Sequence, residues 1–213
     1  MKQINLIILA ISVLFLAPSC SKEDPVPEED QEEVGTAKLV FTEVEREAHD
    51  DHYHYKDMEN PEVKEVIFEG SAMLPPVDAH LHLYVGKTYR LELFTTDFAG
   101  RESQQTFINR ADIHQAFILG NPTQSLEGTM EYVYADRDAD GNRLNVGVTG
   151  YLTVVEEADK FVLRYVMRHL NPGVKESITT EDWSNSDFTQ FTGANDLDLK
   201  VEVHLVGDHE HHH

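Results

Sequence analysis

Apolar and polar side chains alternate along most of the chain beyond Ala37, most clearly near its C-terminal end. A period of two residues is typical of strands that bury one face. Strands are expected in the following segments: Lys38–Val44, Val63–Glu69, His80–Tyr84, Thr88–Phe94, Thr129–Tyr134, Val148–Glu156, Lys160–His169 and Leu197–Leu205. Many short strands with turns between them predict an all-β fold. One dry face per sheet favours an antiparallel β-sandwich, immunoglobulin-like or similar, over a small barrel.

The connections between the strands are predicted from their turn-forming residues. Val85–Lys87 predicts a turn between two strands, and Glu157–Asp159 predicts the tip of a hairpin that joins the strands on either side. Ser103–Leu119 is less decided. Its part Ile108–His114 is compatible with one helical turn or with a strand that carries an insertion.

The N-terminal residues have the layout of a secretory signal peptide. Lys2 supplies a positive charge, and the apolar run Ile4–Ala17 is too short for a membrane-spanning helix. A small residue directly before Cys20, the only cysteine, resembles the lipobox of bacterial lipoproteins. This resemblance implies that Cys20 carries a lipid and becomes the mature N-terminus. The alternative is an ordinary cleaved signal peptide with an incidental cysteine.

The residues after the cysteine predict a location. Ser21–Asp24 resembles the surface-export signal of Bacteroidota lipoproteins, so the domain is expected on the outer membrane, facing the exterior. The alternative is an ordinary acidic tether. Pro25–Val34 is rich in proline and glutamate and is too polar to fold. The expected organisation is a signal peptide at 1–19, a lipidated acidic tether at 20–36, a β-sandwich domain at 37–206 and a histidine-rich tail at 207–213.

Net charge narrows the range of partners. The chain has 39 acidic and 17 basic residues, which gives a formal charge of -22. Such a protein is not expected to bind nucleic acid or an anionic membrane surface, and it suits a cationic ligand. With no cysteine beyond the lipidation site, the stability of the domain is expected to come from packing.

Four short motifs resemble a group of small Bacteroidota lipoproteins that accompany TonB-dependent receptors. They are a turn at Tyr134–Asn142, a Thr-Gly-x-Leu strand at Thr149–Leu152, a strand end at Arg168–Pro172 and an upstream segment at Ala111–Gln115. The resemblance covers most of the domain, although Asp182–Thr192 departs from it. It implies the location, the β fold and a receptor partner, and it implies no particular activity.

The twelve histidines carry the functional prediction. Two clusters stand out: His49, His52 and His54 in a polar stretch between predicted strands, and His209 and His211 in the tail. Imidazole together with carboxylate suits zinc, copper and nickel. The alternative for the tail is an expression tag or a solvated charge run.

His80 and His82 form a different kind of pair. They lie two residues apart on a predicted strand, so their rings are expected on one side and can share a metal ion, while Leu81 and Leu83 fill the core. The alternative is an exposed polar strand face. The string Val77–His82 also imitates the Asp-x-His-x-His motif of amidohydrolases. Those enzymes resemble (β/α)8 barrels of about 250 residues with alternating helices, which this sequence does not supply.

Lone histidines and an acidic turn are weaker candidates. His114, His169 and His204 lie on or beside apolar patterns, where a histidine is more often structural. His114 and His169 fall inside the matching motifs and join the metal candidates. Asp136–Gly141 alternates aspartates as a calcium loop does, but Gly147 stands where an EF-hand needs glutamate, so a hairpin connection is favoured.

The sequence predicts a binding protein rather than an enzyme, because it contains no nucleophile elbow, phosphate-binding loop or available cysteine. The expected function is to bind zinc, with copper or nickel as alternatives, for delivery to a TonB-dependent receptor. Binding through imidazole is expected to weaken in acid, because protons compete for the same nitrogens. Two alternatives stay open: a module for haem or another organic ligand, since paired histidines on a β-scaffold can hold haem iron, and a structural or adhesive surface domain.

Overall fold

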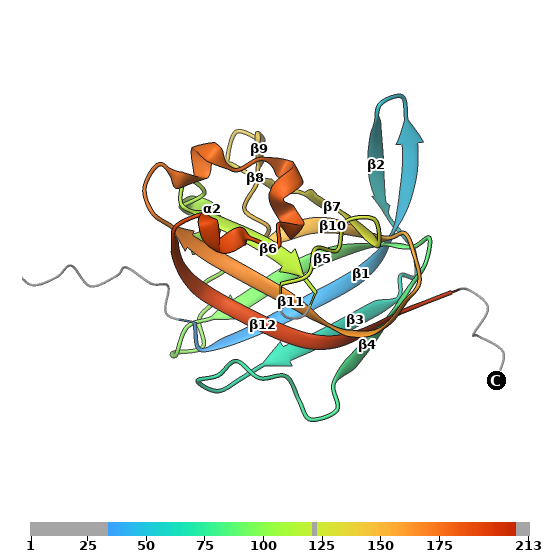
Figure 1. Cartoon of the computed structure of the whole chain (residues 1–213), viewed down its shortest axis with the longest axis horizontal. Coiled ribbons are helices and arrows are strands. Elements are labelled where there is room, and N and C mark those ends of the chain that lie inside the picture. The colour runs from blue at the N-terminus through green and yellow to red at the C-terminus, as the bar shows by residue number, and fades with distance from the viewer. Residues whose placement is uncertain (1–33, 121–122, 208–213) are drawn as a thin grey trace, which may run out of the picture. The chain divides into compact units, whose positions relative to one another are not determined.

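Two sheets account for most of the chain (Figure 1). The structure, a computed structural model, describes residues 34–120 and 123–207. The larger sheet runs in the order β2 (His52–Asp57), β1 (Thr36–His49), β5 (Thr88–Thr96), β10 (Thr149–Val154) and β7 (Met130–Tyr134), and β3 (Val63–Phe68) also pairs with β1. The second sheet runs in the order β4 (His80–Tyr84), β12 (Gly193–Val206), β11 (Ala158–Leu170) and β6 (His114–Leu119).

Short elements complete the described chain. A small hairpin consists of β8 (Asp136–Arg137) and β9 (Arg143–Leu144). The helical segments are α2 (Gln105–Asn109) and the 3-10 helices η1 (Val174–Ser177), η2 (Thr180–Ser184) and η3 (Phe188–Gln190). The prediction of a mostly β protein with antiparallel sheets is confirmed.

The inward faces of both sheets share one hydrophobic core. Leu39 of β1, Leu91 of β5, Leu152 of β10, Leu163 of β11 and Leu199 of β12 are all fully buried in the same cluster. Each of these leucines lies on the inward face of its strand, to which every second residue points. This is the alternation seen in the sequence. Each fully buried leucine contributes about 1.5–3 kcal/mol relative to exposure, so the two sheets are held together mainly by this layer.

The second sheet has a further apolar contact on its outer face. Phe117 of β6 and Val166 of β11 pack with Phe188 and Phe191 from the η3 region. As a result every residue of β6 is buried. This explains why the His114–Leu119 segment lacks the alternation that marks the other strands.

The connections between the strands correct one prediction. The hairpin around Glu157–Asp159 is wrong, because β10 pairs with β5 and β7 whereas β11 pairs with β6 and β12. The connection therefore passes from one sheet to the other. The turn at Val85–Lys87 is confirmed, with Gly86 at a φ of 82°, and it too links the two sheets. Alternation identifies the buried face of a strand but not the strand beside it.

Three further details differ from the expectations. β4 pairs with β12 in parallel, within a structure otherwise built from antiparallel pairs of described strands. The helical turn of the undecided segment lies at Gln105–Asn109, mostly before the predicted range, and β6 begins at His114. In the β8–β9 hairpin, Asp138 accepts hydrogen bonds from the backbone N–H groups of Asp140 and Asn142, which confirms the hairpin interpretation of the acidic turn.

The N-terminal and C-terminal predictions lie outside the described residues. They concern the signal peptide, the lipid on Cys20, nearly all of the tether, and the tail with His209 and His211. Within residues 34–120 and 123–207, no helix is long and apolar enough to cross a membrane.

Candidate functional site

Three of the predicted metal ligands lie at the tip of the β1–β2 hairpin. The polar stretch predicted between two strands is itself strand: β1 ends at His49, β2 begins at His52, and Asp50 and Asp51 form the turn. His49 and His52 are directly opposite each other, so their side chains lie on the same face of the hairpin. His54 is two residues further along β2 and lies on that face too.

The spacing of the three imidazoles suits one metal ion. Their ring centroids are 5.3 Å apart for His49 and His52, 5.2 Å for His49 and His54, and 4.8 Å for His52 and His54. Rings that share a tetrahedral ion at about 2.0–2.1 Å have centroids about 5 Å apart. One ligand nitrogen from each residue lies within 4.8 Å of the others, and all three residues are exposed. We refer to these three histidines as the tip site.

Hydrogen bonds at the tip site assign one ligand atom. The Nδ1 of His52 lies 3.1 Å from a carboxylate oxygen of Asp51, which can only accept, so this nitrogen carries the hydrogen. The Nε2 of His52 then presents its lone pair, 3.1 Å from the Nε2 of His54. A carboxylate behind a histidine in this way is the usual support of a metal-binding imidazole.

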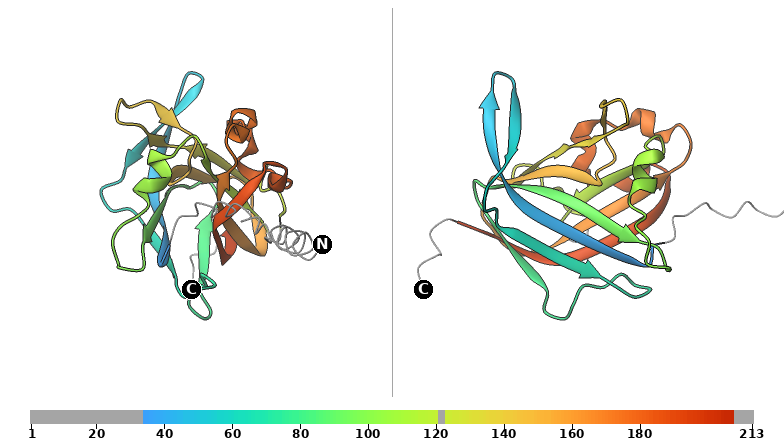
Figure 2. Two further views of the ribbon diagram at one scale, coloured as in Figure 1. Left: turned by 90° about the vertical axis from the view of Figure 1, so that its left-hand side faces the viewer. Right: turned by 180° about the vertical axis from the view of Figure 1, so that it is seen from behind.

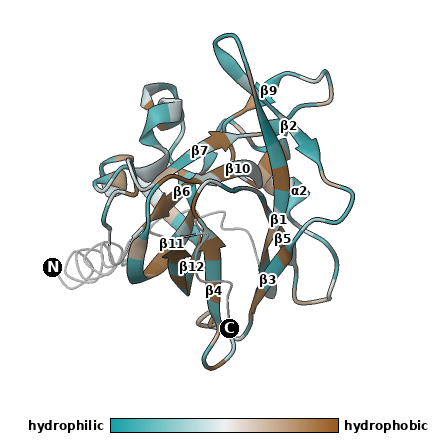
Figure 3. Cartoon of the chain, turned by 90° about the vertical axis from the view of Figure 1, so that its right-hand side faces the viewer, coloured by the Kyte–Doolittle hydropathy of each residue, from teal (hydrophilic) through white to brown (hydrophobic). Residues whose placement is uncertain are grey.

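The base of the hairpin is anchored to the larger sheet. Tyr55 of β2 stacks on Tyr151 of β10 with centroids 3.8 Å apart and planes at 6°. Arg46 of β1 pairs with Glu131 of β7 at 2.6 Å, and its guanidinium lies over the Tyr53 ring at 3.5 Å. The hairpin projects beyond the sheets in both views of Figure 2, and its outer part is hydrophilic in Figure 3. The tip site is thus exposed to solvent at the end of a hairpin whose base is anchored.

His80 and His82 gain a third histidine from the neighbouring strand. The two rings lie on the exposed side of β4 while Leu81 and Leu83 are buried, as the alternation predicts. The parallel register places His204 of β12 opposite His82, with ring centroids 5.0 Å apart. Sequence reasoning left His204 as a lone histidine, because nothing in a sequence indicates which strand β4 pairs with.

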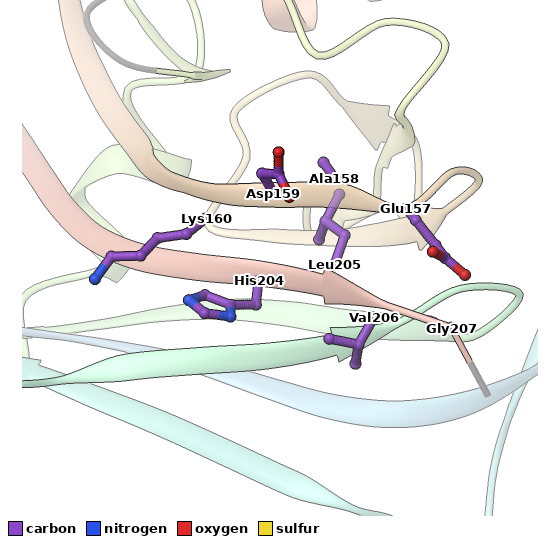
Figure 4. Close-up of a pocket in the computed structure, with 8 residues that line it drawn as sticks. All are labelled: Glu157, Ala158, Asp159, Lys160, His204, Leu205, Val206 and Gly207. Carbon is purple, nitrogen blue, oxygen red and sulfur yellow. The ribbon is translucent and has the colours of Figure 1, made fainter. Parts of the chain in front are cut away.

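The β4–β12 histidines are less ready for a metal ion than the tip site. The centroids of His80 and His204 are 6.2 Å apart. Glu202, the acid opposite His80, already pairs with the ammonium group of Lys160 at 2.6 Å. That hydrogen bond lowers the pKa of the Glu202 carboxyl. Figure 4 shows His204 and Lys160 lining the same open groove along β11 and β12. Lys160 would compete there with a metal ion for the Glu202 carboxylate.

The third group lies in the interior of the protein, in contrast to the exposed histidines of the tip site. His114 of β6, His169 of β11 and Asp196 of β12 offer ligand atoms that all lie within 4.8 Å of one another. The side chains of His114 and Asp196 are wholly buried. Asp196 was missed in the sequence, because the alternation of β12 sends it outward. We refer to these three residues as the enclosed site.

The acidic turn does not offer a comparable group. The side chain of Asp136 points inward and accepts hydrogen bonds from the backbone N–H groups of Gly147 and Thr149. Asp138 is occupied by the turn itself, including the amide of Asn142 at 2.8 Å. The carboxylates of Asp136 and Asp138 therefore bind groups of the loop and do not converge on a common metal position.

The fold, the tip site and the enclosed site define a mostly β protein with two candidate metal-binding groups among the described residues. No protein-family model, curated protein or solved structure matches the chain.

Proposed function

We propose that this protein binds a divalent transition metal ion at the tip site, with zinc as the first candidate and copper and nickel as alternatives. The observation that carries the proposal is the convergence of His49, His52 and His54 on one face of a two-residue turn. Three neutral imidazoles are a donor set that zinc, copper and nickel accept.

The location of the tip site suits capture and release rather than permanent retention. The side chains of His49 and His52 are 62% and 50% exposed. Three protein ligands leave coordination positions open to a ligand from a partner. The charge of -22 draws cations toward the protein, and Asp50 and Asp51 add to that field beside the site.

The cellular part of the proposal rests on the sequence. A lipid on Cys20 would anchor the protein to the outer membrane, with an immunoglobulin-like or similar β-sandwich outside the cell. The captured ion would pass to a TonB-dependent receptor, without an enzymatic step. The resemblance to receptor-associated Bacteroidota lipoproteins supports this placement.

One observation favours a second candidate, an organic ligand. A cleft of about 610 Å³ lies between the hairpin base and β7, with Tyr53, Met130, Tyr132 and Trp183 among its lining residues. Trp183 lies in η2 with its ring 5.8 Å from that of Tyr132. None of the described residues that line the cleft is histidine, so the haem form of this alternative has no axial ligand there.

Calorimetric titration with zinc tests the tip site. The parent is the full chain with His209, His211, His212 and His213 changed to serine, so that the tail cannot contribute. Changing His49, His52 and His54 together to glutamine should remove one zinc equivalent, the one that a weak chelator extracts fastest. Changing His80 and His82 to glutamine serves as the matched control on another strand face and should leave that equivalent in place. An unchanged zinc stoichiometry in the tip variant would refute the proposal.

A further inference from the structure

The enclosed site begins with two histidines that face each other across neighbouring strands. His114 and His169 are register partners in the antiparallel β6–β11 pair, and their rings meet edge to face with centroids 4.8 Å apart. Ala116 and Met167, two residues away on each strand, point into the main core. By strand alternation the two imidazoles lie on that inner side as well. Phe107 of α2 packs edge-on against His114 at 5.2 Å and closes one flank.

A β-bulge brings the third group to the same place. Met167 is opposite Leu197 and Arg168 is opposite Asn195, so the register shift leaves Asp196 as the extra residue on β12. Without the shift, Asp196 would share the outer face with Asp198. Bulges commonly re-aim a side chain in this way. Here the carboxylate turns inward, and its Oδ2 lies 3.1 Å from the Nε2 of His114.

The hydrogen bonding of His114 demands a positive charge between these two atoms. Its Nδ1 lies 3.0 Å from the carbonyl oxygen of Arg110, which can only accept, so Nδ1 carries a hydrogen. A neutral His114 would then aim the lone pair of Nε2 at the Asp196 carboxylate inside the protein. Either a proton, carried by the ring or by the carboxyl group, or a metal ion must lie between the two.

The remaining atoms distinguish a proton from a metal ion. The Nδ1 of His169 lies 3.5 Å from the same Oδ2, which is too poorly placed for a hydrogen bond. Within the described residues, the His169 Nδ1 and the Asp196 Oδ1 are both buried without a hydrogen-bond partner. A proton on His114 would satisfy only one contact and leave both of these atoms unsatisfied, which is rare in protein interiors. One ion held by the three residues gives the His169 nitrogen a partner and also separates the His114 nitrogen from the Asp196 carboxylate.

We infer that His114, His169 and Asp196 form a second, enclosed metal site that takes one zinc ion. Two imidazoles and one carboxylate are a zinc donor set, and the N–O separation of 3.1 Å fits ligands of one tetrahedral ion at about 2.0–2.1 Å. The Arg110 carbonyl oxygen fixes the ring of His114 as an outer-shell acceptor. His169, 16% exposed, marks the side from which solvent completes the coordination. Bound zinc would join β6, β11 and β12, so this site retains its ion and does not depend on the proposed capture at the tip.

The test uses a background that has no tip site. In the full chain, His49, His52 and His54 are changed to glutamine and the four tail histidines to serine, and zinc binding is measured by calorimetry. One zinc per chain is expected to remain. Because loss of an outer-shell partner already costs about 10–100-fold in affinity, removal of the ligand itself in Asp196→Asn should weaken binding by more than about 100-fold.

Asp198→Asn is the matched control. It removes one carboxylate two residues away on the same strand, where Asp198 pairs with Arg164 at 2.7 Å on the outer face, and it should retain the zinc. His169→Gln is a second loss variant, at the only partly exposed ligand of the three. Because the tip is absent from the background, these results are independent of those for the tip site.

Two results would overturn the inference. One is a folded background chain, checked by circular dichroism, that binds no zinc or binds it equally well after Asp196→Asn and His169→Gln. The other is an imidazole ¹⁵N NMR spectrum in which His114 keeps its resonances when zinc is added, which would identify the pair with Asp196 as an ion pair only. If Asp196→Asn does not fold, the His169→Gln variant and the His114 resonances still decide the question.

Discussion

The tip site and the enclosed site offer a metal ion similar chemistry in contrasting surroundings. Each supplies three ligand atoms within 4.8 Å, mostly imidazole nitrogen. At the tip the histidines are exposed and contact mainly each other and the aspartates of the turn. In the enclosed site His114 and Asp196 are wholly buried, and the residues come from three strands of one sheet.

The difference in burial determines whether metal binding at each site is coupled to folding. Exposed ligands on a hairpin tip have little part in folding, so an ion can come and go without disturbing the domain. Buried ligands from three strands bind an ion only when those strands are assembled, so metal binding there is coupled to folding. If both proposals hold, the protein exchanges a metal ion at the tip site and retains one at the enclosed site.

The largest expected effect concerns stability without metal. Asp196→Ala leaves His114 without its partner in the interior, and removing one partner of such a buried pair typically costs about 3–5 kcal/mol. The triple glutamine variant of the tip site should change the free energy of unfolding by less than about 0.5 kcal/mol, as exposed substitutions usually do. Urea denaturation in a chelator measures both values. Equal losses would remove the proposed division between the two sites.

The sequence did not predict β2 or β6, but it predicted most of the strands and their buried faces, because both follow from alternation. That is why His80 and His82 were correctly expected on the exposed side of one strand, opposite Leu81 and Leu83. It was also why Asp196 was overlooked: the odd positions from Leu197 onward face the core, and only a bulge reverses the order for the residue before them.

The partner strands were out of reach of the same reasoning. His204 meets His82 through a parallel pairing between segments more than 120 residues apart in the numbering, about which the local pattern carries no information. The tip histidines were grouped correctly, but in a polar stretch between predicted strands. In the structure a two-residue turn of aspartates, with Asp50 at a φ of 50°, joins paired strands that carry them.

A smaller effect concerns the dependence of stability on pH at the acidic turn. Burial raises the pKa of Asp136 from an ordinary value of 3.8 to about 6, although hydrogen bonds from Gly147 and Thr149 act in the opposite direction. The folded chain therefore holds this proton more tightly than the unfolded chain. Its contribution to stability is fully present below about pH 4 and is lost as the pH rises through about 6, a change of about 3 kcal/mol.

Comparison with Asp136→Asn isolates this contribution. In urea denaturation at pH 4 to 7 with chelator present, the parent should lose stability relative to the variant as the pH rises. Asp140→Asn, in the exposed part of the same turn, controls for the loss of one carboxyl group and should give a curve parallel to that of the parent. A constant difference between the parent and Asp136→Asn across this range would show that Asp136 does not hold its proton more tightly in the folded chain.

The smallest effect separates hydrogen bonding from charge at the tip. Asp51 accepts from the Nδ1 of His52 at 3.1 Å, whereas the Asp50 carboxylate is 3.6 Å from the Nδ1 of His49. Asp51→Asn should weaken zinc binding at the tip about 10-fold, because the carboxylate orients the imidazole. Asp50→Asn removes the same charge from the same turn, and asparagine tolerates its positive φ, so it should cost only a few-fold. Calorimetry in a background that carries Asp196→Asn and serine at the four tail histidines measures the tip without the enclosed site and the tail. Equal losses would mean that the aspartates act only through their field, and the tip would then be a loose cation collector rather than a site with an oriented ligand.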